Sequence, residues 1–209
     1  LSQFVGDTQK LLRLKLENNE NILLEGAQGA LLDIDHGSYP FVTSSNSTIG
    51  GAITGTGLVP ADIKNTIGIF KAYATRVGEG PFPSEIPKSD SVGNHILEKG
   101  HEFGTTTGRE RRCGWFDIDS ANYSIMTNGF NKIAIMKLDV LDGIKNIKIL
   151  KNGDYISLPG WEQSTFGIDD YANLPENAVK YIEFIEKELN VEISVISTGP
   201  KRNQTIFKS

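Results

Sequence analysis

The sequence predicts an α/β fold in which helices pack against a central sheet. Short apolar runs alternate along the chain with longer segments whose apolar residues recur every three or four positions. Runs of the first kind are typical of buried strands, and segments of the second kind are typical of amphipathic helices. Because strands alternate with helices, we expect a layered fold whose ligands bind in the loops at the strand ends.

Three segments in the first third of the chain carry a clear pattern. Leucines spaced among lysine and arginine over residues 11–16 predict a helix, which Asp7 or Thr8 caps. The short apolar run at residues 21–25 stops at a glycine and predicts a buried strand. Residues 60–73 predict a helix, because a proline suits its first turn and its apolar side chains share one face.

The rest of the chain repeats the same two patterns. Helices are expected over residues 89–99, 117–128 and 174–189, and strands over residues 132–136, 144–150 and 191–196. Asp117 supplies the cap of the second of these helices. No fixed-period repeat and no long linker divides the chain, so we expect one domain over residues 1–209.

Composition excludes several classes of protein. The 209 residues include 21 basic and 26 acidic side chains, a formal net charge of −5, so the chain lacks the overall positive field that favours nucleic acid or anionic membranes. No apolar run approaches the roughly 18 residues of a membrane span. The single cysteine excludes an intramolecular disulfide and suits a reducing compartment. We therefore expect a cytoplasmic protein with no nucleic-acid or membrane partner.

Glycines flank Gln28 in residues 25–30, directly after the first predicted strand. They let the backbone approach a ligand, and the amide of Gln28 can donate to and accept from the edge of a heterocycle. A tight turn is the alternative. Asp33 and Asp35 with His36 suggest metal ligands or, alternatively, an acidic turn in solvent.

Hydroxyl side chains gather in residues 41–48, just before a glycine-rich stretch. Hydroxyl and backbone N–H groups suit a phosphate, while serine, threonine and asparagine are equally typical of a helix N-cap. The sequence contains no Gly-Lys-Ser/Thr ending, so neither this stretch nor the later glycine-rich loop is a P-loop.

Three arginines follow three threonines in residues 104–112. Arg109 and Arg111 project to the same side of an extended segment and would clamp an anion. The alternatives are a solvated loop, or a salt bridge within the protein to Glu110 or Asp117.

The two predicted strands 132–136 and 191–196 end in polar loops. A carboxylate at Asp139 could accept from two guanine N–H positions, which adenine does not offer, and the stem of Lys137 could cover the base. A surface ion pair is the alternative.

These loops together, in their order along the chain, resemble the adenylosuccinate synthetase family. The stretches that carry the resemblance are GAQGALLDIDHGSYPFVTSSNST, KAYATRVGEGPFPSE, FGTTTGRERRCGWFD, KLDVLDG and LPENAVKYIEFIEKELNVEISVISTGP. The resemblance implies an α/β fold with a mixed central sheet flanked by helices, related to P-loop nucleotide hydrolases. It also implies a homodimer that uses Mg²⁺ and couples GTP hydrolysis to the joining of IMP and L-aspartate.

The resemblance also implies a role for each matched residue. IMP would contact Gln28, Thr43, Val77, Gly78 and Arg109, with Gln28 acting on O6 as the catalytic contact. L-aspartate would contact Thr105, Thr106, Thr107, Gly108, Arg109, Glu110 and Arg111. GTP would contact Arg111, Lys137, Leu138, Asp139, Ser197, Thr198 and Gly199.

The sequence departs from the family most in what it does not contain. The phosphate loop, the catalytic Asp and His and the Mg²⁺ ligands belong to the family's N-terminal half, so the resemblance implies a C-terminal portion of one domain, without turnover by itself. Glu110, where the family often has Pro or Arg, adds a negative charge near the aspartate site. A non-catalytic module that binds guanine nucleotide and aspartate, or a synthetase for another 6-oxopurine nucleotide, are the alternatives.

Overall fold

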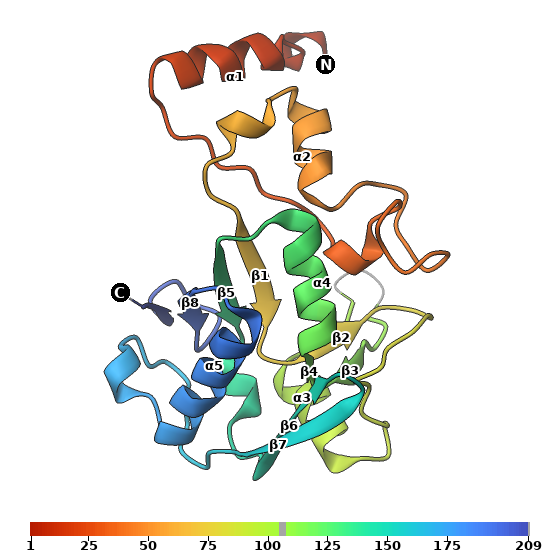
Figure 1. Cartoon of the computed structure of the whole chain (residues 1–209), viewed down its shortest axis with the longest axis vertical. Coiled ribbons are helices and arrows are strands. Elements are labelled where there is room, and N and C mark those ends of the chain that lie inside the picture. The colour runs from red at the N-terminus through yellow and green to blue at the C-terminus, as the bar shows by residue number, and fades with distance from the viewer. Residues whose placement is uncertain (105–107, 209) are drawn as a thin grey trace. The chain divides into compact units, whose positions relative to one another are not determined.

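The computed structural model describes residues 1–104 and 108–208, and these form two compact units. The first unit comprises Leu1–Thr66 and Thr127–Gly129, and the second contains the remaining residues. Figure 1 traces the chain from the N-terminal helices to the C-terminal strands. No helix in the described ranges is long and apolar enough to cross a membrane.

The first unit is helical. It contains α1 (Thr8–Glu17) and α2 (Ile49–Thr56), together with short 3₁₀ turns at Ser2–Phe4, Ala30–Leu32 and Pro60–Asp62. The predicted cap of α1 is confirmed, because the Asp7 carboxylate accepts a hydrogen bond from the backbone N–H of Lys10 at 2.9 Å.

The strand predicted at residues 21–25 is wrong. These residues have no regular secondary structure, and Leu23 is 90% exposed. A strand needs a neighbouring backbone to pair with, and residues 1–66 and 127–129, all of which are described, contain no strand at all. A short apolar run is therefore not sufficient to predict a strand.

The helix predicted at residues 60–73 is also wrong. The 3₁₀ turn Pro60–Asp62 is followed by an extended segment and then by strand β1 (Ile67–Lys71). The β-branched side chains of Ile67 and Ile69 favour extended backbone, and β1 gains a parallel partner in β5 (Lys132–Met136). Pairing with a strand more than 60 residues away in the sequence therefore outweighed the helical spacing of the apolar residues in this segment.

The second unit is built on a mixed four-stranded sheet in the order β1-β5-β8-β9. Strands β1, β5 and β8 (Ile193–Ser197) are parallel, and β9 (Thr205–Phe207) is antiparallel to β8. The expected mixed α/β sheet is thus confirmed. Helix α5 (Glu176–Leu189) packs one apolar face on this sheet (Figure 1), and the phenol of its Tyr181 donates to the carbonyl of Ala72 at 2.5 Å.

The other predicted elements of this unit are confirmed within a few residues. They are α3 (Ser91–Lys99), α4 (Ile118–Asn128), which ends within the first unit, and β6 (Asn146–Lys151). The sequence patterns did not reveal β2 (Ala74–Arg76), β3 (Arg112–Gly114), β4 (Phe116–Asp117) or β7 (Asp154–Pro159), which form two small sheets ordered β2-β3 and β4-β6-β7.

The parallel register places three strand ends at one edge of the main sheet. Lys71 at the end of β1 lies opposite Met136 at the end of β5, and Ile135 of β5 lies opposite Ile196 of β8. The loops that follow these strands therefore begin side by side, which is where α/β sheets place their ligands.

Candidate functional site

A buried carboxylate lies at this edge of the sheet. Glu102 follows α3, its side chain is fully buried, and it accepts hydrogen bonds from four side chains. The donors are Lys71 Nζ at 2.9 Å from both oxygens, Tyr73 Oη at 2.6 Å, Lys137 Nζ at 2.8 Å and the Arg111 guanidinium at 2.8 Å.

These contacts keep Glu102 ionised in spite of its burial. Burial alone raises the pKa of a carboxyl group, but the hydrogen bonds from Lys137, Tyr73 and Lys71 outweigh it and lower the pKa of Glu102 to about 2. Three cationic side chains thus share one anionic partner, so these four charged groups carry a positive surplus at a strand-end edge. An anionic ligand would be attracted to such a surplus.

Arg111 therefore forms the salt bridge within the protein that was one alternative for its loop. Its partner is Glu102, which the sequence reasoning did not name, and the two expected acids have other partners. Glu110 pairs with Lys88, and Asp117 caps α4 by accepting from the backbone N–H of Ser120 at 3.0 Å. The side chain of Arg111 remains 28% exposed, so it is still accessible to a ligand.

The backbone of this loop closes on itself. The N–H of Gly104 donates to the carbonyl of Arg109 at 2.8 Å, and the N–H of Gly108 donates to the carbonyl of Gly104 at 2.7 Å. Gly108 has a φ of +63°, which glycine adopts without strain. Thr105, Thr106 and Thr107, predicted to hold aspartate, lie outside the described residues.

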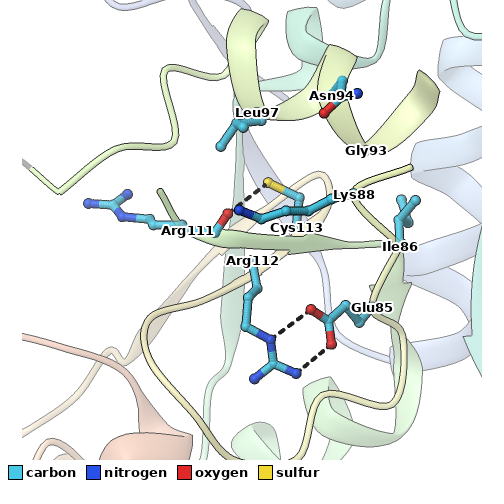
Figure 2. A pocket seen from close by; sticks show the side chains of 9 residues that line it. All are labelled: Glu85, Ile86, Lys88, Gly93, Asn94, Leu97, Arg111, Arg112 and Cys113. Carbon is cyan, nitrogen blue, oxygen red and sulfur yellow. Dashed lines mark hydrogen bonds and ion pairs between the residues drawn. The ribbon is translucent and has the colours of Figure 1, made fainter. Parts of the chain in front are cut away.

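A small pocket lies beside β3 and α3, and Arg111 and Arg112 both line it. Figure 2 shows the two side chains, one just before β3 and one at its start, pointing in different directions. Arg112 turns to Glu85 and to the carbonyl of Gly80, so its charge is already used within the protein. None of the residues predicted to bind the guanine base lines this pocket. Of the residues that line it, Arg111 alone was predicted to bind a ligand.

The two predicted guanine loops start from adjacent strands. Lys137 leaves β5 in the left-handed region with a φ of +62°, and its ammonium group also donates to the carbonyl of Gly100 at 2.7 Å. The side chain of Leu138 is fully buried, so only its backbone is available to a ligand. Burial raises the pKa of the half-buried Asp139 carboxyl, an effect that its own backbone N–H and nearby Lys137 oppose.

Hydrogen bonds within the chain fix the second guanine loop. Ser197 Oγ donates to the carbonyl of Gly199 at 3.1 Å, and the buried Thr198 hydroxyl donates to the carbonyl of Ile168 at 2.7 Å. A Cβ at Gly199 would meet Gln204 Oε1 at 2.5 Å, so a larger residue at this position would displace the Gln204 side chain.

Val77 and Gly78 form an exposed turn after β2. Val77 is 58% exposed, and Gly78 has a φ of +74° with no atom near the position of a Cβ. The guanidinium of Arg76 donates to the carbonyl of Glu79 at 2.9 Å, and that of Arg112 donates to the carbonyl of Gly78 at 3.3 Å. The turn is therefore held by arginines from β2 and β3.

Gln28 and Thr43 belong to the first unit. Gln28 is exposed and has a φ of +63°, which is uncommon for a residue with a side chain. The backbone N–H of Thr43 donates to the carbonyl of Leu32 at 2.7 Å, which ties the hydroxyl-rich loop to the preceding 3₁₀ turn.

Asp33 organises the same loop, and it is not an acidic residue in solvent. Its carboxylate is fully buried and accepts from the backbone N–H groups of Asp35, His36 and Thr48 and from the Thr48 hydroxyl. Burial opposes its charge, but these hydrogen bonds hold the pKa of Asp33 well below its usual range. Thr48 occupies the N-cap position of α2, as the N-cap alternative predicted, but its side chain makes no capping hydrogen bond and its hydroxyl donates to Asp33 instead.

Within the described ranges, no group of three His, Cys, Asp or Glu side chains could hold a metal ion. His95 bonds to the carbonyl of Val140 at 3.0 Å and so ties α3 to the loop after β5.

The sequence reasoning missed Glu102, Lys71 and Tyr73. Glu102 is one acidic residue in a turn, and no local pattern distinguishes it. Lys71 and Tyr73 lie in the segment that was predicted as a helix. Their position at the end of a strand would have marked them as candidate site residues only if β1 had been predicted.

Comparison with known proteins connects these loops to one family. Residues 1–206 match the adenylosuccinate synthetase family. Adenylosuccinate synthetase of Thermodesulfovibrio yellowstonii is 47% identical over the whole chain, and that of Meyerozyma guilliermondii is 46% identical. The match covers 54% of each of these relatives, so the chain spans about half the length of the curated relatives that it matches.

Solved structures agree with the sequence comparison. The fully ligated adenylosuccinate synthetase of Plasmodium falciparum superposes with a TM-score of 0.94 at 39% identity, over 98% of this chain and 54% of that one. Succinoaminodeoxyadenylate synthetase of cyanophage S-2L superposes with a TM-score of 0.65 at 20% identity, over 97% of this chain and 50% of that one, which shows a shared fold alone. The sequence match and the closely similar structure together show that the chain belongs to the adenylosuccinate synthetase family.

Proposed function

We propose that this chain supplies IMP-, aspartate- and guanine-binding loops to an enzyme that joins IMP to L-aspartate at the expense of GTP. The observation that carries the proposal is the contact between the predicted anion loop and the predicted guanine loop. Arg111 and Lys137 bond to the same buried carboxylate at the carboxyl edge of the sheet. A reaction that uses a dicarboxylic amino acid and a guanine nucleotide together needs such neighbouring sites.

The proposed reaction has two steps. The γ-phosphoryl group of GTP is transferred to O6 of IMP, and the amine of aspartate then attacks C6, forming the C–N bond while phosphate leaves with the O6 oxygen. The amide N–H of Gln28 would donate to O6 as negative charge develops there, and Thr43, Val77, Gly78 and Arg109 would hold the nucleotide. Positioning and charge stabilisation supply most of the catalysis in phosphoryl transfer.

Arg111 is proposed to bind a carboxylate of aspartate and to approach GTP. Arginine suits this role because its planar guanidinium binds a carboxylate or phosphate through two parallel hydrogen bonds. One guanidinium nitrogen of Arg111 bonds to Glu102, and its buried Nε has no hydrogen-bond partner in the described part of the protein. Because this Nε is buried, a ligand would meet the exposed part of the side chain, which is 28% exposed.

Asp139 is proposed to read guanine. Its carboxylate would accept hydrogen bonds from the ring N1–H and from the 2-amino group, and adenine has neither donor in that arrangement. Partial burial makes an unmatched base costly here, since the carboxylate would lose water without gaining a partner.

Several further properties are proposed for the whole protein. These are Mg²⁺ dependence, a homodimer, a cytoplasmic location, and a place for residues 1–209 within one synthetase domain. Mg²⁺ would neutralise phosphate charge, but the described residues offer no cluster of ligands for it, so we derive no step through the ion.

The function is tested on the product of the complete reading frame that contains these residues. With IMP, GTP, Mg²⁺ and aspartate it should form adenylosuccinate, whereas the chain of 209 residues by itself should not, because it has no phosphate loop. If the complete product binds guanine nucleotide and aspartate without turnover, the non-catalytic module is favoured. If it prefers another 6-oxopurine nucleotide over IMP, the related synthetase is favoured.

Substitutions test the individual roles. Asp139→Asn should lower kcat/KM for GTP roughly 100-fold and leave the KM for IMP nearly unchanged, because it removes one acceptor from a bidentate contact. The matched control is Asp154→Asn, at an exposed aspartate in the β6–β7 hairpin. Arg109→Leu and Arg111→Leu should raise the KM for aspartate or abolish turnover. Equal losses for GTP and IMP in Asp139→Asn would argue against the guanine assignment.

A further inference from the structure

We infer that Glu102 is a positioning residue that holds Arg111 and Lys137 in place together, so that the aspartate-binding and guanine-binding loops depend on one buried carboxylate. The inference rests on the proposed function and adds to it a residue that contacts no predicted ligand.

Each carboxylate oxygen of Glu102 accepts a hydrogen bond from a different loop. Oε2 accepts from the guanidinium of Arg111 at 2.8 Å, and Oε1 accepts from the ammonium of Lys137 at 2.8 Å. The main chain adds a second tie, because the N–H of Arg111 donates to the carbonyl of Glu102 at 2.8 Å. Both the side chain and the backbone of Arg111 are thus set by the position of Glu102.

Two further donors hold Glu102 itself. The buried phenol of Tyr73 donates to Oε1 at 2.6 Å, and Lys71 lies 2.9 Å from each oxygen. These two residues come from the end of β1 and the turn after it, which belong to the main sheet. The carboxylate is therefore fixed to the sheet, and through it the two loops are fixed to the sheet and to each other.

Removing the charge would affect both loops. A neutral side chain at position 102 would leave three cations close together with no anion among them, and these would repel each other. Arg111 and Lys137 would then move away from each other, and their nearest free direction is toward solvent, since their side chains are 28% and 37% exposed. A structural role in folding alone would predict no such selective effect on two substrates.

The experiment measures steady-state kinetics for all three substrates in the complete reading-frame product. Glu102→Gln should raise the KM for aspartate and the KM for GTP about tenfold each, as expected when a charged hydrogen bond that positions a ligand group is lost. The KM for IMP should change by less than about twofold, because most of its predicted contacts lie in other loops. Glu102→Asp keeps the charge and should recover part of both losses.

Two control variants separate positioning from general stability. Tyr73→Phe removes one neutral donor from the same cluster but keeps the charge of Glu102 and its contact with Lys71, so it should raise both KM values by a smaller factor than Glu102→Gln does. Glu188→Gln breaks a partly buried pair with Lys151 that touches no predicted site residue. If Glu188→Gln raises both KM values as much as Glu102→Gln does, the effect is general destabilisation and the inference is overturned.

The remaining outcomes also decide the question. If Glu102→Gln does not fold, Glu102→Asp carries the test, because its shorter side chain cannot reach all four donors and should raise both KM values by a smaller factor. A folded variant with both KM values unchanged, or with only one of them raised, overturns the inference and leaves the proposed function intact. Absence of turnover in the unaltered protein overturns the proposed function, and the inference falls with it.

Discussion

Asp142 offers a quantitative test of how the guanine loop is held. Its buried carboxylate accepts from Trp161 Nε1 and Thr165 Oγ1 at 2.7 Å each, and from the Thr165 backbone N–H at 2.8 Å and Ser164 Oγ at 3.1 Å. The segment thus fixed reaches the guanine loop, because the N–H of Gly167 donates to the carbonyl of Thr198 at 3.1 Å.

The substitution Asp142→Asn should destabilise this unit. An amide has one acceptor oxygen where the carboxylate has two, and its NH₂ group would face two donors. Two of the four hydrogen bonds are therefore lost, and at about 1.5 kcal/mol for each bond to a charged acceptor the free energy of unfolding should fall by about 3 kcal/mol. With a urea dependence of about 2 kcal/mol per M, the midpoint should fall by about 1.5 M.

Tryptophan fluorescence during urea unfolding is a suitable measurement, because Trp161 is itself one of the donors and Trp115, the other tryptophan, is also buried in this unit. The matched control is Asp169→Asn, at an exposed aspartate of the same segment, which should change the free energy of unfolding by less than about 0.5 kcal/mol. A midpoint for Asp142→Asn that lies within about 0.3 M of the control would refute the reasoning about shared acceptors.

Three further predictions concern acid stability, thiol reactivity and packing. The pKa of Glu102 is lowered to about 2, so the ionised carboxylate contributes fully to stability above about pH 4.3, the pKa of an unfolded Glu, and this contribution is lost as the pH falls toward 2. The urea midpoints of the unaltered protein and of Glu102→Gln should therefore converge between about pH 4.3 and pH 2. A difference between the two midpoints that stays constant over this range would contradict the prediction. Burial raises the pKa of Cys113 to about 11, so Ellman's reagent should label the native thiol at least about 100-fold more slowly than the denatured chain, and equal rates would contradict its burial. A Cβ at Gly160 would overlap the carbonyl oxygen of Ile144, so Gly160→Ala should lower the melting temperature by about 8 °C or more, whereas Gly6→Ala, with open space around its Cβ, should not.

Helices with a local signal were predictable. Helix α5 has apolar residues at helical spacing over 14 residues, and the capping aspartates of α1, α3 and α4 lie within three residues of the N–H groups that they accept from. Such contacts are made between near neighbours in sequence, so the pattern that predicts them is visible without the fold.

Strand β1 shows where this reasoning stops. Its five residues are too short to establish a period, and the spacing of Ile63, Ile67 and Phe70 fits a helix face by coincidence. What makes the segment a strand is the parallel pairing of Ile67–Lys71 with Lys132–Met136, and that pairing depends on how the whole chain folds.

The candidate site divides in the same way. By itself, the sequence determined the family to which the loops belong and the residue types that could bind a phosphate, a carboxylate or a guanine, because these are properties of short segments. The tertiary structure alone decided that Arg111 pairs with Glu102 and not with Glu110, and that Lys137 shares that carboxylate. The physical reason is that a buried charge takes its partners from whichever segments the fold packs around it. For Glu102 these are the end of β1 and the turn after it, the loop before β3 and the segment after β5, and no local pattern records that choice.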